Sequence, residues 1–427
     1  MLGDVRGAVL DSGAARVDGR RLAEALLGAF DGPPADVVVV GAGLAGCSLA
    51  LHLTESNVNV VLLEARQPGW GASGRNAGHV LPTLKDLDII RQFPDGGKRF
   101  FELFREHHTI PFDLAKKHNI DCDATQTGYL NAMTRESVFE DYTRLSKFWQ
   151  NEQGQNVELL GKHDMEQATG SSYYPFGVLY QSGGRVNPYL LSNGMAAAAT
   201  SRGASVFGNS EALTLTKQSS HWRVTTEKGS VTANRVVFCT NAYPSNIVPA
   251  FTNNFYPLTA YTLCTKPLPE KAAEIIMPSR STLAQAPIDL HPFIIDDKNR
   301  IVVSSIPSAS RAADASTYFN NHLAWIHRTW PDVREMKLEL EHYWTGRVAL
   351  RDREFPGVFE LDKGLFGLMH FNAWGNVMAP LMGKIFAQSL AQDRLDQLPF
   401  PMEKPEPVGN PNKQNFIIRR LLIPAAR

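Results

Sequence analysis

Two short apolar runs near the N-terminus flank a glycine-rich turn and a helical pattern. Asp36–Val40 and Asn59–Leu63 are the apolar runs, and Leu44–Thr54 between them has the composition of a helix. Apolar residues that are continuous rather than alternating indicate burial on both faces, as in a parallel sheet. The pattern predicts a strand, a helix and a second strand in one unit.

Further along the chain, the pattern changes twice. Residues from Lys98 to Gln155 read as polar helices, and short strands with proline between them follow from 251 to 343. These later strands, such as Tyr261–Thr265 and Arg300–Ser304, favour antiparallel pairing. Additional helices are expected at Tyr189–Ser201 and Val377–Leu390, and additional strands at Ser205–Phe207, Trp222–Thr226, Val236–Thr240 and Gly364–His370.

A chain of 427 residues exceeds the size of one ordinary core, so two interleaved units are expected. The first would comprise 36–97, 185–250 and 344–400, and the second 98–184 and 251–343, with an antiparallel sheet. Residues 1–35 would form an N-terminal extension and 401–427 a C-terminal tail.

Composition narrows the possible partners to small molecules. Basic and acidic residues number 43 each, so no net field attracts nucleic acid or an anionic membrane. Residues 1–35 contain several aspartates and no apolar run of signal length, and no stretch is long enough to span a membrane. The cysteines lack metal-site and disulfide spacing, which favours reduced thiols in a cytoplasm and no metal; they are Cys47, Cys122, Cys239 and Cys264.

The turn after the first strand has the pattern of a dinucleotide-binding site. Gly41 allows a tight turn, Gly43 lets the backbone approach a pyrophosphate, and Gly46 permits close helix–strand packing. Glu64 ends the next strand, where a carboxylate accepts hydrogen bonds from ribose hydroxyls and disfavours a 2′-phosphate. FAD and NAD both remain possible. The expected contacts are Gly41, Gly43, Leu44, Ala45, Gly46, Glu64 and Ala65.

A second glycine-rich motif, Gly71-Ala-Ser-Gly-Arg-Asn-Ala-Gly78, decides between these cofactors. It resembles the second flavin motif of the D-amino-acid oxidase-like superfamily of FAD-dependent oxidoreductases, most closely the γ-glutamylputrescine oxidase group. The resemblance continues through IDCDATQTGYL (120–130), SGGRVNP (182–188), TNAY (240–243), YWTGR (343–347) and FNAWGNVMAPLMG (371–383).

This resemblance implies an α/β fold, in which a Rossmann-type FAD-binding domain is interleaved with an α+β substrate domain. It implies FAD, expected to bind non-covalently with covalent attachment at His79 as the alternative, and it implies that Ala212 lies beside the adenine and the start of the last helix faces the pyrimidine end of the flavin. The implied contacts are Gly71, Ala72, Ser73, Arg75, Asn76, Ala77, Gly78, Ala212, Thr240, Asn241, Trp374, Gly375, Asn376, Val377 and Met378.

The implied chemistry is hydride transfer to the flavin from a C–H next to an amine nitrogen, which gives an imine. The substrate-side candidates are His79, Arg347 and Trp374. His79 would lie beside the flavin or be an ordinary hydrogen-bonded histidine, and His370 poses the same choice. Arg347, with Arg351 and Arg353, would clamp a carboxylate or form a solvated charge cluster. Tyr261 and Trp374 would wall an amine pocket or pack in a core.

Two departures from the family pattern keep other functions open. The chain has Ala373-Trp374-Gly375-Asn376 where the family usually has Gly-His-Gly, and Ser304-Ser305 where glycines are common. The alternatives are a hydroxylating or desaturating tailoring enzyme and a non-catalytic FAD-binding subunit. Oxygen, a quinone or another protein would accept the electrons. Residues 1–35 and 410–427 are candidates for an oligomer or weak membrane contact.

Overall fold

The computed structural model describes residues 34–84, 86–244, 246–308 and 313–410. Its first unit is built on a sheet in the order β17-β18-β11-β1-β2-β8. Five strands are parallel: β1 (Ala35–Val40), β2 (Val60–Leu63), β8 (Ser205–Phe207), β11 (Ser230–Phe238) and β18 (Leu365–Met369). The antiparallel strand β17 (Gly357–Asp362) forms one edge, and β9 (Thr214–Gln218) and β10 (His221–Thr225) extend antiparallel from β11.

Both faces of this sheet are buried, because successive side chains of a strand point to opposite faces. Val37 and Val39 of β1 pack in one core with Leu49 of α3 (Leu44–Glu55), whereas Val38 and Val40 pack in another with residues of β9 to β11. On the first face α3 lies against α9 (Pro188–Ser201) and α12 (Gly375–Ala391). The predicted Rossmann-type parallel sheet is confirmed.

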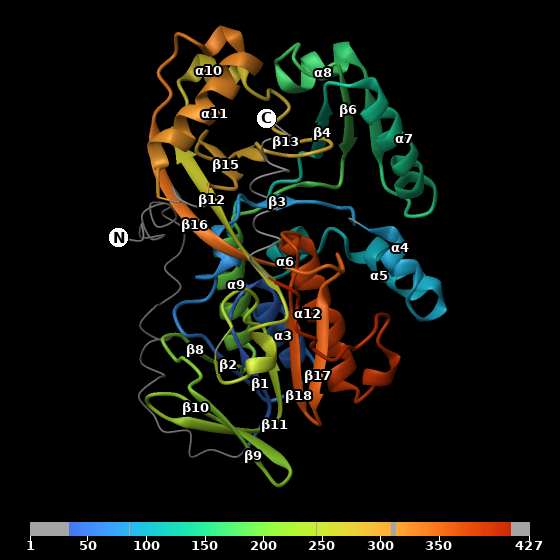
Figure 1. The fold of residues 1–427 in the computed structure, drawn as a ribbon, viewed down its shortest axis with the longest axis vertical. Helices are drawn as coiled ribbons and strands as arrows, with labels where there is room; N and C mark the ends of the chain where they lie inside the picture. The colour runs from blue at the N-terminus through green and yellow to red at the C-terminus, as the bar shows by residue number, and fades with distance from the viewer. Residues whose placement is uncertain (1–33, 85, 245, 309–312, 411–427) are drawn as a thin grey trace.

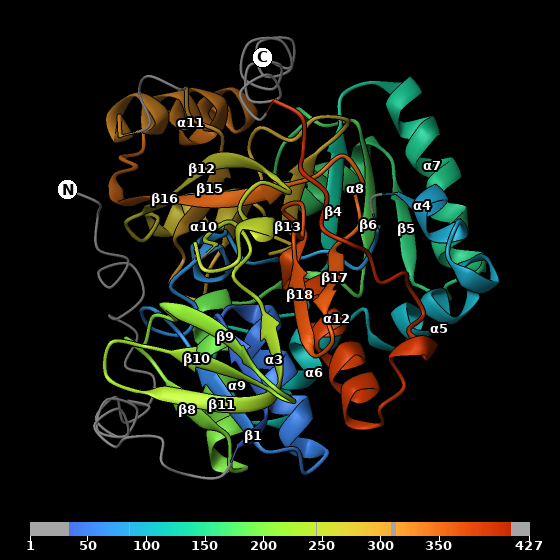
Figure 2. The ribbon, with the colours of Figure 1, turned by 60° about the horizontal axis from the view of Figure 1, so that its bottom comes forward.

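The second unit contains an eight-stranded sheet in the order β16-β12-β15-β14-β13-β4-β6-β5. The strands are β4 (Tyr129–Met133), β5 (Val157–Leu160), β6 (Phe176–Tyr180), β12 (Tyr256–Thr265), β13 (Thr282–Gln285), β14 (Phe293–Ile295), β15 (Ile301–Ser305) and β16 (Leu340–Leu350). Pairing is antiparallel except between β13 and β4, which are parallel, so the expectation of a wholly antiparallel sheet is corrected at that pair. Figures 1 and 2 show β12 and β16 reaching from this unit toward the first.

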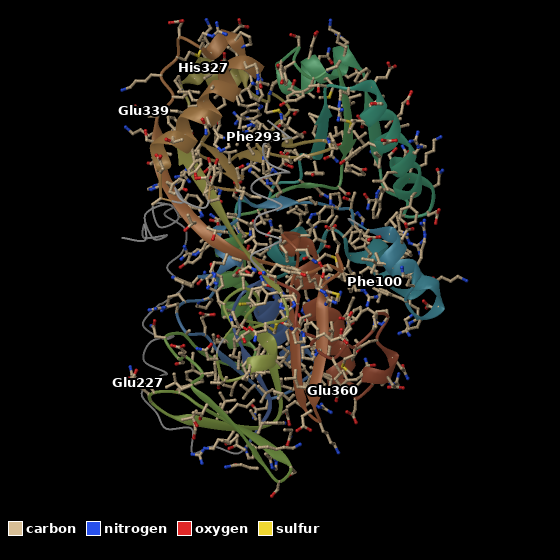
Figure 3. The ribbon with its side chains drawn as sticks, in the orientation of Figure 1. Phe100, Glu227, Phe293, His327, Glu339 and Glu360 are labelled. Atoms are coloured by element: carbon tan, nitrogen blue, oxygen red, sulfur yellow. The ribbon has the colours of Figure 1, made fainter. Side chains whose placement is uncertain are left out.

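The core of the first unit extends into the second sheet, where it includes Tyr129, Val157 and Val178 of β4, β5 and β6, and the rest of the second unit has a core of its own. Tyr261, Leu263 and Phe293 pack against α10 (Glu270–Ile275) and α11 (Ala315–Thr329), and Phe100 lies in the core of the first unit (Figure 3). The remaining helices are α4 (Leu87–Arg91), α5 (Lys98–His107), α6 (Ile110–Lys117), α7 (Glu136–Asn151) and α8 (Lys162–Thr169), and β3 (His79–Val80) pairs with β7 (Gly184–Arg185).

Three details differ from the sequence analysis. Strand β4 interrupts the stretch from Lys98 to Gln155, whose apolar spacing reads as helix on either side. Helices α5 and α6, expected in the second unit, contribute Phe100, Phe104 and Leu114 to the core of the first. Strand β16 pairs with β12 as far as Leu350, so residues 344–350 belong to the second sheet.

The expected N-terminal extension lies almost wholly outside the described residues, and so does the tail beyond residue 410. Within the part of the chain that is described, no helix is long and apolar enough to cross a membrane.

Candidate active site

The glycine turn between β1 and α3 leaves no room for side chains at two of its positions. Gly41 has φ +103°, and a Cβ there would lie 2.9 Å from the Cys239 carbonyl oxygen. A Cβ on Gly46 would lie 1.9 Å from the Gly41 carbonyl oxygen. The turn and the helix therefore pack as closely as the dinucleotide pattern requires.

Glu64 lies at the end of β2, next to this turn. Its Oε2 accepts from the Ala42 N–H at 2.8 Å and its Oε1 from the Arg66 N–H at 2.9 Å. Burial raises the pKa of Glu64, and these two hydrogen bonds oppose the rise. The carboxylate is thereby fixed at the edge where parallel strands end, which is the usual place for a nucleotide in such a sheet.

Residues 71–79, which we call the 71–79 loop, pass over the turn. The loop contains a short 3₁₀ helix, Ala72–Arg75, whose Ser73 Oγ accepts from the Leu44 N–H at 2.9 Å. Asn76 closes the loop on itself, because its Oδ1 accepts from the Gly78 N–H at 2.8 Å and its Nδ2 donates to the Ser73 carbonyl at 2.8 Å. The two glycine motifs of the sequence thus touch each other.

The first turn of α12 meets the same loop from the other side. Asn376 Nδ2 donates to Asn76 Oδ1 at 2.9 Å and to the His79 carbonyl at 2.7 Å. Trp374, the residue before the helix, makes no side-chain cap, and the buried Asn376 Oδ1 has no hydrogen-bond partner among the described residues. A helix N-terminus with free N–H groups is a favourable place for negative charge.

The ends of β11 and β18 complete this edge. Asn241, at φ +48°, accepts through Oδ1 from the His370 N–H at 2.8 Å. The neighbouring Thr240 Oγ1 is buried without a partner among the described residues. Ala212 is 5% exposed, and nearby Ser210 donates its N–H to the Glu64 carbonyl at 2.7 Å.

Comparison with known proteins identifies the family of this chain and its cofactor. The sequence pattern of the DAO family, FAD dependent oxidoreductases, matches residues 36–389. The chain belongs to this family. It is a flavoenzyme with FAD as its cofactor.

Individual relatives agree with the family. The chain is 28% identical over 378 residues to gamma-glutamylputrescine oxidoreductase of Escherichia coli (strain K12), covering 86% of this chain and 88% of that protein. Glycine oxidase from Geobacillus kaustophilus has a similar structure, with a TM-score of 0.71 at 19% identity over 88% of this chain and 99% of that one. L-proline dehydrogenase from P. horikoshii gives a TM-score of 0.68 at 19% identity, with 86% and 95% covered.

The residues present fit FAD. A Cβ on Gly43 would lie 2.7 Å from Ser73 Oγ, so glycine keeps open the space where the backbone approaches the 71–79 loop. Glu64 offers a carboxylate to the ribose, and the start of α3 offers N–H groups to the pyrophosphate. The unpartnered buried atoms Thr240 Oγ1 and Asn376 Oδ1 lie along the same edge, where a cofactor would supply their missing hydrogen bonds.

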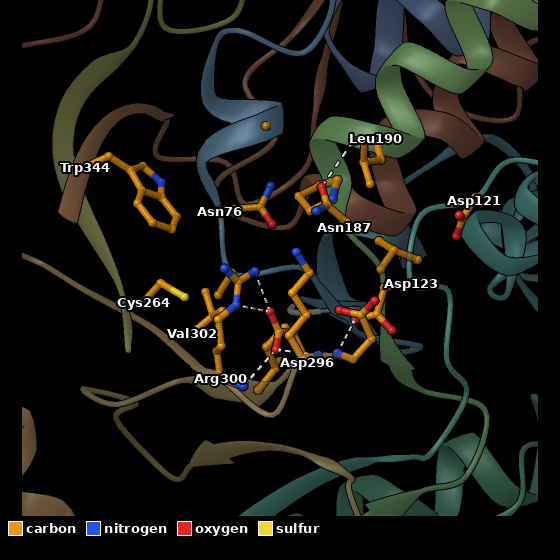
Figure 4. Close-up of a pocket in the computed structure, with 17 residues that line it drawn as sticks. Asn76, Asp121, Asp123, Asn187, Leu190, Cys264, Asp296, Arg300, Val302 and Trp344 are labelled. Carbon is orange, nitrogen blue, oxygen red and sulfur yellow. Dashed lines mark hydrogen bonds and ion pairs between the residues drawn. The ribbon is translucent and has the colours of Figure 1, made fainter. Parts of the chain in front are cut away.

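A cavity of about 330 Å³ adjoins the 71–79 loop of this FAD-dependent oxidoreductase (Figure 4). It lies between the units and is lined by Asn76, Asn187, Asp123, Asp296, Arg300 and Trp344 among others. Asp123 is bound bidentately by Arg185 at 2.9 Å, and Asp296 pairs with Arg300 at 2.8 Å. The lining combines charged and polar groups with apolar side chains, and its volume lies within the usual range of ligand pockets.

His79 is buried, with its ring directed away from α12. Its Nε2 lies 3.1 Å from the Phe293 carbonyl and 3.3 Å from the Leu283 carbonyl, so this nitrogen carries the proton. Burial lowers the pKa of His79 to about 4, which keeps the ring neutral. The part of His79 that faces the first turn of α12 is its main-chain carbonyl, which Asn376 binds.

The three arginines after Trp344 lie in different surroundings. Arg347 is exposed on β16, and by strand alternation it faces away from Trp344 and Gly346, which contact Arg75. Arg351 and Arg353 both bind Glu403, at 2.5 and 2.8 Å. The carboxylate that this pair clamps therefore belongs to the protein itself.

The remaining candidates with ring side chains lie in three different places in the structure. Trp374 lines a small cavity of about 20 Å³ with Phe371 and Met378 at the start of α12. Tyr261 is 4% exposed in the core of the second unit and hydrogen-bonds His322 Nε2 at 2.8 Å, so it does not wall this cavity. His370 is fully buried, and neither ring nitrogen has a partner among the described residues.

Sequence reasoning missed contacts between distant segments. Thr262 Oγ1 and Trp344 Nε1 both donate to the Arg75 carbonyl, at 2.9 Å each, and fix the second sheet to the 71–79 loop. YWTGR, one of the motifs of the resemblance, includes Trp344. Asn372 lies in the motif 371–383, but the sequence does not indicate its partners, and Glu403 carries no local signal, because the partners of both residues come from other parts of the chain.

Proposed function

We propose that this flavoenzyme oxidises a small amine or amino-acid-like substrate, by hydride transfer from the C–H adjacent to the nitrogen. The observation that carries the proposal is the similarity along most of both chains to gamma-glutamylputrescine oxidoreductase, a protein named for a substrate with an amine nitrogen. When FAD is bound, it supplies the redox chemistry.

The protein's own groups bind, orient and shield. The 71–79 loop is rigid, because Asn76, Ser73 and Arg75 all make hydrogen bonds within it or to its neighbours. The α12 N-terminus offers N–H groups to negative charge on the pyrimidine end of the ring. We infer that the binding residues are those of the sequence analysis, with Asn76 and Asn376 joining the two halves of the site.

Among the substrate-side candidates, we infer a role for Trp374 from its position directly before α12, since the cavity of about 20 Å³ that it lines has room for about one water molecule. An aromatic face beside an ammonium group or an apolar chain favours binding. His79 supports the site through its main-chain carbonyl, since its Nε2–H donates to the main-chain carbonyls of Leu283 and Phe293. An amine that enters already deprotonated needs no side chain as a base.

A cytoplasmic location stays a prediction, supported by four free and buried cysteines. Oxygen, a quinone or a partner protein remain alternatives for the electron acceptor.

The proposal is tested by mixing the enzyme with candidate substrates without oxygen and following the bleaching of the flavin absorbance. The panel consists of glycine, sarcosine, proline, and putrescine with and without a γ-glutamyl group, each paired with an analogue in which a hydroxyl group replaces the amine, such as glycolate for glycine. We expect at least one amine to reduce the flavin at a saturable rate while its hydroxyl analogue does not.

Three results would contradict the proposal. Failure of every amine while FAD stays bound would remove amine oxidation, and reduction by NADPH without any other substrate would favour a hydroxylating enzyme. Reduction by glycolate but not by glycine would show that the site acts on C–O rather than C–N bonds.

A further inference from the structure

The loop between β18 and α12 has an unusual backbone. His370, Asn372 and Ala373 have φ of +65°, +50° and +65°, a region that favours glycine, and none of them is glycine. Such residues persist where the surrounding structure holds them, and they cluster at functional sites. This loop directly precedes the first turn of α12, so its conformation fixes where that helix begins and points.

The side chain of Asn372 holds this loop against the segment that follows β16. Its Oδ1 accepts from the Arg351 N–H at 2.9 Å, and its Nδ2 donates to the Arg353 carbonyl at 3.2 Å. One amide therefore bridges two main-chain positions of the 351–353 segment. Any movement of that segment is passed to the 370–373 loop.

Glu403 in turn fixes the 351–353 segment. It binds Arg351 at 2.5 Å and Arg353 at 2.8 Å, with side chains 20%, 13% and 31% exposed for Glu403, Arg351 and Arg353. Its main chain is held too, because it donates to the Val358 carbonyl at 2.8 Å and accepts from the Glu360 N–H at 3.1 Å. A carboxylate with two hydrogen-bonded guanidinium partners and low exposure contributes more than an ordinary surface pair.

The surroundings make this carboxylate hard to replace. Arg351 Nη1 is buried without a partner among the described residues, and so are both nitrogens of His370. Burial and the charge of Arg351 lower the pKa of His370 to about 3, so the histidine does not compensate a lost negative charge. Without Glu403, two guanidinium groups would repel each other beside a neutral ring.

We propose that Glu403 is a positioning residue of the flavin site: through Arg351, Arg353 and Asn372 it holds the 370–373 loop and aims the α12 N-terminus at the flavin. This rests on the placement of the pyrimidine end at α12 that the proposed function uses. A helix N-terminus that points at the flavin stabilises negative charge on the reduced ring and thereby raises the reduction potential of the flavin. The C-terminal segment, 401–410, thus contributes to the chemistry without touching it.

The test compares the holoenzyme with E403Q, which keeps the side-chain shape and removes the charge, and with E403D, which keeps the charge. Two readouts are measured at full FAD occupancy: the reduction potential, by titration against reference dyes, and the dissociation constant for sulfite, an anion that adds to oxidised flavin. We expect E403Q to lower the potential and weaken sulfite binding several-fold, up to about tenfold. E403D should recover part of both.

The control is E55Q, because Glu55 forms a comparable ion pair with Lys117 at 2.6 Å and is 21% exposed, at the far end of α3. It should lower the melting temperature without moving the potential. Equal potentials and sulfite affinities in E403Q and the wild type would overturn the proposal, as would equal shifts in E55Q and E403Q. Neither readout uses an amine, so failure of amine oxidation is distinguished from failure of this inference.

Discussion

Asn376 Nδ2 donates to Asn76 Oδ1 at 2.9 Å, although the two residues are 300 positions apart. Asn76 belongs to the glycine-rich loop near the N-terminus, and Asn376 to the first turn of the last long helix. The same Nδ2 also binds the His79 carbonyl at 2.7 Å. One amide group thus joins the two most distant pieces of the proposed FAD site.

We expect N376A to weaken FAD binding more than it weakens the fold. The change leaves the His79 carbonyl and one site on Asn76 Oδ1 without their donor, at a cost of about 1–3 kcal/mol for an unpaired buried acceptor. In the proposed FAD site these acceptors border the cofactor, so the variant should hold the loop and the helix less firmly around FAD. Measurement is by the FAD dissociation constant and by the melting temperature of the apoprotein.

N193A is the matched control for this variant. Asn193 Nδ2 also donates to two main-chain carbonyls, those of Pro68 at 2.9 Å and Tyr189 at 2.8 Å, on helix α9. It should lower the melting temperature by a similar amount and leave FAD affinity nearly unchanged. The interpretation fails if both variants lose FAD equally.

Two alanine variants in the glycine turn should separate an effect on folding from an effect on FAD binding. A Cβ on Gly46 meets the Gly41 main-chain oxygen at 1.9 Å, whereas a Cβ on Gly43 meets only the Ser73 side chain, at 2.7 Å. G46A should therefore destabilise the fold by about 1–3 kcal/mol, as overpacked cores do. G43A should fold, since a side chain moves more cheaply than a backbone, but lose FAD affinity at least about tenfold.

Chemical denaturation of the apoproteins and FAD titration distinguish these two effects. G229A is the control, because a Cβ on Gly229 has no neighbour within 4 Å and the residue has no positive φ. If G43A bound FAD as tightly as the wild type, the turn would not approach the cofactor as we infer.

Local patterns predicted the FAD unit well, for a physical reason. Val37–Val40 and Val60–Leu63 are apolar at every position because both faces of a parallel sheet are covered, and this pattern is visible within a few residues. The glycine spacing likewise reflects a turn that closes locally. Strand β4 was missed because Tyr129–Met133 is short and lies between helices.

The sequence predicted the site less completely, because its geometry depends on contacts between remote segments. From the sequence, Arg351 and Arg353 were candidates to bind a substrate carboxylate. Only the fold shows that both form ion pairs with Glu403. Arg347 is also an arginine of this region, but its side chain lies on the face of β16 opposite to Trp344, which contacts Arg75. His79 has the expected place in sequence, yet its ring points to Phe293.

The buried histidines predict how stability depends on pH. Burial lowers the pKa of His79 to about 4, burial together with the neighbouring His291 lowers the pKa of His322 to about 3, and burial together with Arg351 lowers the pKa of His370 to about 3. In the unfolded chain each would titrate near 6.5, so the unfolded state binds more protons between these values. The free energy of unfolding should therefore be constant above about pH 6.5 on their account and fall as the pH drops toward 4.

H322Q tests this assignment. His322 hydrogen-bonds Tyr261 at 2.8 Å and His291 at 2.8 Å inside the second core, where added charge finds no solvent. Its replacement should lower the free energy of unfolding at pH 7.5. Between pH 6.5 and 4.5 this free energy should then fall less steeply than in the wild type, with the slope reduced by the contribution of about one bound proton. H163Q, at an exposed histidine of α8, is the control. Denaturant unfolding of the holoenzyme at several pH values measures both slopes, and parallel curves for H322Q and the wild type would show that His322 does not set the acid limit.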